Sequence, residues 1–173
     1  MEKDTNDPDF ILEIYHSNKG SLDQINAIID AKLIQKHQRK ISIFENYIKS
    51  RLLKNPKKLE MTALEINPTE ATYLSLYPDL NRIEKLDLRQ NQLGDRGLEA
   101  IANSKIIVNL KELDLRNNQI TREGMQSLMV SPNMKNLKKL DLRLNKMGGK
   151  LWFERLQESG NFPALEDFRG GAF

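Results

Sequence analysis

Leucines in the second half of the chain recur in a fixed pattern of apolar and charged positions. Three segments, which begin at positions 83, 110 and 137, read IEKLDLRQNQL, LKELDLRNNQI and LKKLDLRLNKM, and each begins 27 residues after the previous one. Two leucines alternate with charged residues in every segment, so the leucines share one face of an extended strand and the charges share the other. Repetition at this spacing predicts a solenoid of stacked coils.

The connections between these strands predict helices. Parallel strands need a long crossover, and about a dozen residues remain for one between successive strands. Two connections carry a glycine followed by apolar residues at helical spacing: Gly97, Leu98 and Ile101 in the first, and Gly124, Met125 and Leu128 in the second. The repeat unit is therefore a strand followed by a helix.

The pattern L-x-x-L-x-L-x-x-N-x-L resembles the leucine-rich repeat, because five positions recur in register three times. Repeats of 27–28 residues that include a helix resemble the ribonuclease-inhibitor-like subclass of that family. The resemblance implies an α/β solenoid with a parallel sheet on its concave side and helices on its convex side. It also implies a binding surface rather than a catalytic pocket, since the family commonly binds protein on the concave face.

An asparagine follows each clear strand where the chain turns: Asn91, Asn118 and Asn145. The amide of such a residue offers donors and an acceptor to the backbone of adjacent coils. We therefore expect a structural asparagine ladder rather than catalytic residues.

The array is expected to span residues 56–173 and to be irregular at both ends. A degenerate first coil over 56–82 places Leu59 and Met61 at the strand and Leu64 in the asparagine position. The clear repeats cover 83–109, 110–136 and 137–164, with one extra residue near Gly148-Gly149. A partial coil over 165–173 ends in Arg169-Gly170-Gly171-Ala172-Phe173, which indicates a truncated chain or an edge strand that pairs with another copy.

The N-terminal region, residues 1–55, is expected to be helical. Apolar residues at 3- and 4-residue steps predict amphipathic helices at about 21–36 and 40–54. Ser21 is suited to cap the first helix, and Asn55-Pro56 to end the second. Because the core of a solenoid is open at its first coil, we interpret this region as an α-helical cap.

Charge in this region is divided. Residues 1–30 contain seven acidic and two basic side chains, whereas residues 31–58 contain nine basic side chains and Glu45 alone on the acidic side. A basic cluster can bind nucleic acid or an acidic surface, here through Lys32, Lys36, Arg39 and Lys40. No run of stacking aromatics accompanies it, so a solvated basic face is favoured.

Composition excludes several classes of function. The 173-residue chain has no cysteine and a net charge of +3, so it has no thiolate chemistry and no strong charge to dictate a partner. Its two histidines, His16 and His37, lie far apart in sequence, and no motif predicts catalytic residues, a metal site or a cofactor. The first ten residues are unlike a signal peptide, which favours a cytoplasmic protein. An effector exported without a cleaved signal would look the same.

The outward strand positions are the candidate binding residues. We expect Asp87, Asp114 and Asp141 to form one column on the concave face and Arg89, Arg116 and Arg143 a second beside it. The columns either neutralise each other or present a bipolar template to a charged partner. The remaining outward positions are Lys85, Glu112 and Lys139.

The function favoured by these patterns is a non-catalytic adaptor that binds another protein through the concave strand face. Trp152 and Phe153 are an alternative anchor, although rings of this kind more often lie in a core. Two other functions stay open: binding of nucleic acid or an acidic surface through segment 31–58, and self-association through an open end of the solenoid.

Overall fold

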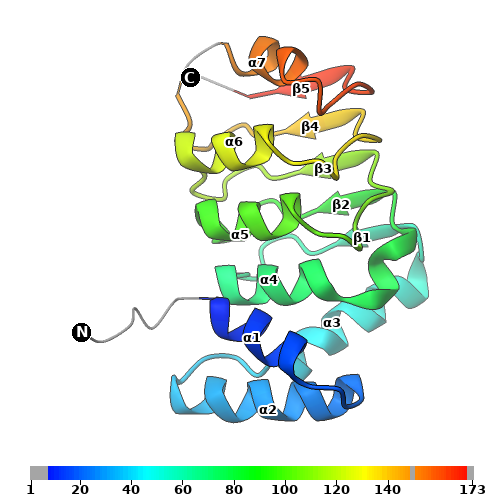
Figure 1. The fold of residues 1–173 in the computed structure, drawn as a ribbon, viewed down its shortest axis with the longest axis vertical. Coiled ribbons are helices and arrows are strands. Elements are labelled where there is room, and N and C mark those ends of the chain that lie inside the picture. Colours follow the sequence, from blue (N-terminus) through cyan, green and yellow to red (C-terminus); the bar gives the residue numbers. More distant parts are fainter. Residues whose placement is uncertain (1–7, 149–150, 171–173) are drawn as a thin grey trace.

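The computed structural model describes residues 8–148 and 151–170 of the chain. Five short strands form one parallel sheet in sequence order, and helices lie on its other side (Figure 1). The strands are β1 (Lys58–Glu60), β2 (Lys85–Asp87), β3 (Glu112–Asp114), β4 (Lys139–Asp141) and β5 (Asp167–Arg169). The α/β solenoid predicted from the repeats is confirmed.

The repeat spacing sets the register of the sheet. Leu59 pairs with Leu86, and Leu113 with Leu140, so each 27-residue step brings equivalent residues side by side. The last step is 28 residues and pairs Leu140 with Phe168. Gly149, one of the two glycines expected to hold the extra residue, lies outside the described residues. In β1 to β4 the central leucine points into the core and its two charged neighbours point away from it, whereas Phe168, the central residue of β5, is only partly buried.

The connections between strands contain the helices that the spacing predicted. They are α4 (Pro68–Leu76), the 3-10 helix η1 (Pro78–Arg82), α5 (Gly94–Ala102), α6 (Arg122–Met129) and α7 (Trp152–Glu158). Helix α4 begins with a capping box, in which the side chains of Asn67 and Glu70 each accept a backbone N–H from the other residue. The inner faces of these helices pack toward the sheet through buried side chains such as Leu98 and Met125.

Three helices precede the first strand and lie at the lower end of the stack (Figure 1): α1 (Asp9–Ser17), α2 (Leu22–Gln35) and α3 (Ile41–Lys54). Helices α2 and α3 lie within two residues of the ranges expected from the sequence, and Ser21 caps α2 through a capping box with Gln24. Helix α1 was not predicted. It packs against α4, where the Tyr15 hydroxyl donates to the carbonyl of Leu76 at 3.1 Å.

One hydrophobic core runs from these helices through the coils. At the junction, Phe44 of α3 packs edge-on against Tyr73 of α4, with ring centroids 6.4 Å apart. Beside them Arg39 forms a bidentate ion pair with Glu70, whose side chain is only 3% exposed. The helical region is thus joined to the first coil by apolar packing and by one largely buried ion pair.

Candidate functional site

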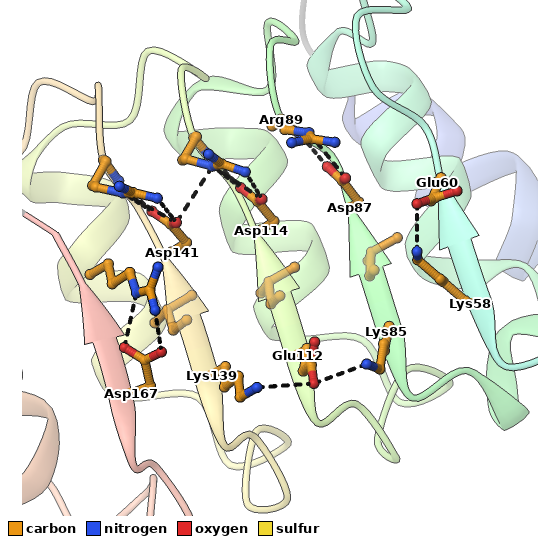
Figure 2. Close-up of a pocket in the computed structure, with 16 residues that line it drawn as sticks. Lys58, Glu60, Lys85, Asp87, Arg89, Glu112, Asp114, Lys139, Asp141 and Asp167 are labelled. Carbon is orange, nitrogen blue, oxygen red and sulfur yellow. Dashed lines mark hydrogen bonds and ion pairs between the residues drawn. The ribbon is translucent and has the colours of Figure 1, made fainter.

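The charged side chains of the strands line a groove of about 470 Å³ on the side of the sheet opposite the helices. We call this surface the concave face. Figure 2 shows its side chains standing in rows across neighbouring strands. Its charged members are seven basic and six acidic residues: Lys58, Lys85, Arg89, Arg116, Lys139, Arg143, Arg169, Glu60, Asp87, Glu112, Asp114, Asp141 and Asp167.

The aspartates and arginines expected to form two columns lie together on this face. Asp87, Asp114 and Asp141 are direct neighbours in the register of the sheet. Each arginine two residues further along the chain turns back onto the aspartate of its own repeat, as Figure 2 shows for Arg89 and Asp87. The nitrogen–oxygen distances are 3.1 Å for Arg89–Asp87, 2.6 Å for Arg116–Asp114 and 2.7 Å for Arg143–Asp141.

The centre of this network is the most tightly coupled part. Arg116 lies 2.6 Å from Asp114 and also reaches Asp141 of the next strand at 3.5 Å. The hydrogen bonds to Asp114 raise the pKa of the Arg116 guanidinium against the opposing effect of burial. Burial raises the pKa of Asp141, but the hydrogen bonds and charge of Arg143, with the charge of Arg116, outweigh it and leave that pKa below its ordinary value.

A separate row of alternating charge crosses the other end of the same strands. Glu112 of β3 forms an ion pair with Lys85 at 3.1 Å and another with Lys139 at 3.5 Å. Burial raises the pKa of Glu112, but the two lysines outweigh it, so the net shift is downward. The sequence placed these three residues on the face, and the alternation of sign, which sequence reasoning missed, was readable from their 27-residue spacing.

The outer strands β1 and β5 extend the network, and their charged residues follow each other in opposite order along the chain. In β1, Lys58 pairs with Glu60 at 2.6 Å. In β5 the order of charges is reversed, so that Asp167 lies beside Lys139, and Arg169 beside Asp141. The face is therefore largely neutralised from within, yet the three column arginines keep 28% to 46% of their side-chain surface exposed.

The three asparagines lie under the turns that leave the strands. The Asn118 side chain is fully buried and donates to the carbonyls of Leu88 and Leu115 at 2.8 and 3.1 Å. Asn91 and Asn145 repeat this arrangement one coil earlier and one coil later. The ladder thus gives backbone carbonyls in the turns a hydrogen-bond donor and links each coil to the one before it.

The basic segment that was a candidate for nucleic-acid contact is partly engaged with the protein itself. Arg39 binds Glu70 and the carbonyl of Leu64. The ammonium groups of Lys32 and Lys36 lie 5.9 and 4.6 Å from the ring centroid of Phe10. Lys40, which precedes α3, is exposed.

The other residues considered in the sequence, two aromatic residues as a binding anchor and two histidines for catalysis, lie in different parts of the fold. Trp152 is 4% exposed and its indole N–H donates to the carbonyl of Gly148 at 2.6 Å, while Phe153 is partly buried. His16 lies in α1 and His37 in the turn after α2. Within residues 8–148 and 151–170, no cluster of three or more acidic, histidine or cysteine side chains is arranged to hold a metal ion. No helix in the same part of the chain is both long and apolar enough to cross a membrane.

Comparison with known proteins agrees with this architecture. The family model described as "Leucine Rich repeat" matches residues 82–102, 108–129 and 133–150. A solved structure described as "Leiomodin-1 Actin-Binding Site 2 (ABS2)" is similar, with a TM-score of 0.59 and 17% sequence identity, over 76% of this chain and 80% of that one. No curated protein sequence matches the chain significantly. Leucine-rich repeats are in general a non-enzymatic binding scaffold. The matched segments and the five-stranded parallel solenoid together identify residues 82–150 as leucine-rich repeats.

Proposed function

We propose that this protein is a non-catalytic binding module whose concave face contacts another protein. The observation that carries this proposal is the groove itself, in which charged side chains from five strands stand in fixed rows. A parallel sheet and the asparagine ladder hold these rows in place before any partner arrives. The face therefore loses little conformational entropy on binding, so polar contacts of modest strength are sufficient.

The exposed arginines indicate the chemistry of the partner. The guanidinium groups of Arg89, Arg116 and Arg143 follow one line across strands that lie about 4.8 Å apart. Each is aligned by an aspartate on one side and remains partly exposed on the other. A planar guanidinium binds a carboxylate in two places, so we expect the partner to present acidic side chains along an extended segment or a helix.

The leiomodin domain that shares this fold is named as an actin-binding site. Because the sequence identity is 17%, the likeness shows the fold and leaves the partner to experiment. Actin is therefore the first defined protein to test, beside capture from a native lysate.

The experiment compares the wild type with a variant in which Arg89, Arg116 and Arg143 are all replaced by glutamine. A control carries the same charge loss elsewhere, at the exposed positions Lys54, Lys105 and Lys135. Each protein is immobilised, incubated with lysate or with purified actin, and analysed by mass spectrometry. The proposal predicts one protein that the wild type and the control retain and the arginine variant loses.

Equal capture by all three proteins would contradict the concave site. The basic segment would instead be supported as the binding element if the captured material is nucleic acid and is lost when Lys32, Lys36 and Lys40 are replaced by glutamine. Circular dichroism of each variant checks that the fold is intact.

A further inference from the structure

The last strand of the described sheet has a free edge. Strand β5 pairs with β4 on one side and has no strand on the other in the part of the chain that the structure describes (Figure 1). The backbone N–H of Asp167 donates to Lys138, and the carbonyl of Arg169 accepts from Leu142. Because successive residues of a strand direct their backbone groups to opposite edges, the N–H and carbonyl of Phe168 point away from the sheet. They form a donor and an acceptor at the centre of an open edge.

The charges that flank Phe168 are self-complementary in one orientation. If two copies of β5 met as antiparallel strands centred on Phe168, each Phe168 would exchange two hydrogen bonds with its counterpart. Asp167 of one copy would then lie opposite Arg169 of the other, and the reverse pair would form on the far side of Phe168. These flanking positions are non-hydrogen-bonded pairs, where side chains approach most closely and opposite charges stabilise the pairing.

Other strands of the sheet do not share all of these properties. The other charged pair of this kind at a sheet end is Lys58 and Glu60 in β1, but α3 packs beside that strand and joins it to the helical cap. In β2, β3 and β4 a neighbouring strand lies on each side. The free edge and the self-complementary charges thus coincide at β5.

Apolar surface lies next to this edge. The Phe168 ring stacks on the Phe153 ring of α7, with centroids 6.0 Å apart and planes inclined by 13°. Both rings are only partly buried, unlike the aliphatic core residues of the inner coils. A second β5 placed beside the first would bring two of these ring pairs together across a twofold axis, because directly opposed residues of an antiparallel pair point to the same face.

We infer that β5 is a self-association site, at which two copies of this chain join by antiparallel pairing of Asp167–Arg169. The interface is short, so the dimer is weak and forms only as concentration rises. It uses the edge of the sheet rather than the concave face, and it would place the two concave faces in one continuous sheet. Self-association through β5 is independent of the proposed function, so either proposal can be refuted while the other stands.

The test is a charge complementation. In Asp167→Arg, both flanking positions are positive; in Arg169→Asp, both are negative. Each variant alone would oppose like charges across the twofold axis, whereas an equimolar mixture would oppose unlike charges at both positions. Sedimentation velocity over micromolar to millimolar concentration measures the mass of the wild type, each variant and the mixture, and circular dichroism verifies folding. Glu60→Arg, which changes charge by the same amount as Asp167→Arg on the covered strand, is the control.

The inference predicts that the wild type and the Glu60→Arg control shift with concentration from the mass of one chain to that of two. Each β5 variant stays at the mass of one chain, and their mixture regains the larger mass. A wild type that stays monomeric throughout, β5 variants that dimerise as the wild type does, or a mixture of folded variants that does not dimerise would overturn it.

Discussion

The asparagine ladder makes a quantitative prediction because neighbouring asparagines share acceptors. The carbonyl of Leu88 accepts at 2.8 Å from Asn91 and at 2.8 Å from Asn118. The carbonyl of Leu115 accepts in the same way from Asn118 and Asn145, at 3.1 and 2.9 Å. When one asparagine is replaced, each shared carbonyl therefore keeps one donor.

In Asn118→Ala, three hydrogen bonds to carbonyls are lost, those to Leu88, Leu115 and Arg116, each contributing about 0.5–1.5 kcal/mol. The N–H of Leu93 also loses an acceptor at 3.4 Å. We expect the free energy of unfolding to fall by about 2–4 kcal/mol in total. Asn109→Ala is the matched control, because the Asn109 amide also donates to a carbonyl of the adjacent coil, at 2.8 Å, but is exposed. We expect it to cost less than about 1 kcal/mol.

The double variants test the sharing directly. Replacing Asn91 and Asn118 together leaves the buried carbonyl of Leu88 without either donor, which adds about 1–3 kcal/mol beyond the sum of the single changes. Replacing Asn91 and Asn145 also removes two amides, but these two residues share no acceptor carbonyl. The losses in free energy of unfolding from the two single changes should therefore add. Urea denaturation followed by circular dichroism gives each free energy. Equal coupling in the two pairs, or none in either, would refute the shared-acceptor reasoning.

Three further changes test other parts of the structure. Arg39→Met leaves the buried Glu70 carboxylate without its cationic partner, and we expect the free energy of unfolding in urea denaturation to fall by about 2–4 kcal/mol. Arg96→Met, which breaks exposed ion pairs, should cost less than about 1 kcal/mol. Burial, with the charge of Glu45, raises the pKa of the Tyr73 hydroxyl. The neutral Tyr73 side chain therefore contributes its full stability to the fold below about pH 10, and this contribution is lost as the pH rises through the higher pKa of the folded state. Tyr73→Phe should therefore reduce the fall in melting temperature above about pH 10; an unchanged alkaline profile would argue against this. Leu144 is 56% exposed at a φ of 61°, so Leu144→Asn should raise stability by about 0.5–1 kcal/mol, and a lower melting temperature would contradict that reasoning.

The strands and most helices could be read from the sequence because they follow a strong period. Alternating leucines fixed the strands, and the 27-residue step fixed which leucines are neighbours in the sheet. Helix α1 was missed because it lies outside the repeating part of the chain and follows a polar segment. The spacing of its two buried residues, Ile11 and Ile14, is the pattern that indicates a helix there.

The composition of the concave face could be predicted from the sequence, but its internal pairing could not. Register alone places aspartates beside aspartates and arginines beside arginines. Whether Arg116 faces solvent or turns back to Asp114 depends on side-chain rotamers and on Asp141 of the next strand, which carry no periodic pattern. The Arg39–Glu70 pair was missed for a similar reason, since it joins residues 31 positions apart across two structural units.

The most direct test of the concave face is the affinity of the captured partner, measured by isothermal titration calorimetry at physiological salt. The account predicts that the variant with glutamine at positions 89, 116 and 143 binds at least about tenfold more weakly than the wild type, a loss of about 1.4 kcal/mol or more. The control with glutamine at 54, 105 and 135 should bind as the wild type does. Equal affinity for the arginine variant and the wild type, with both proteins folded, would contradict the claim that this face makes the contact.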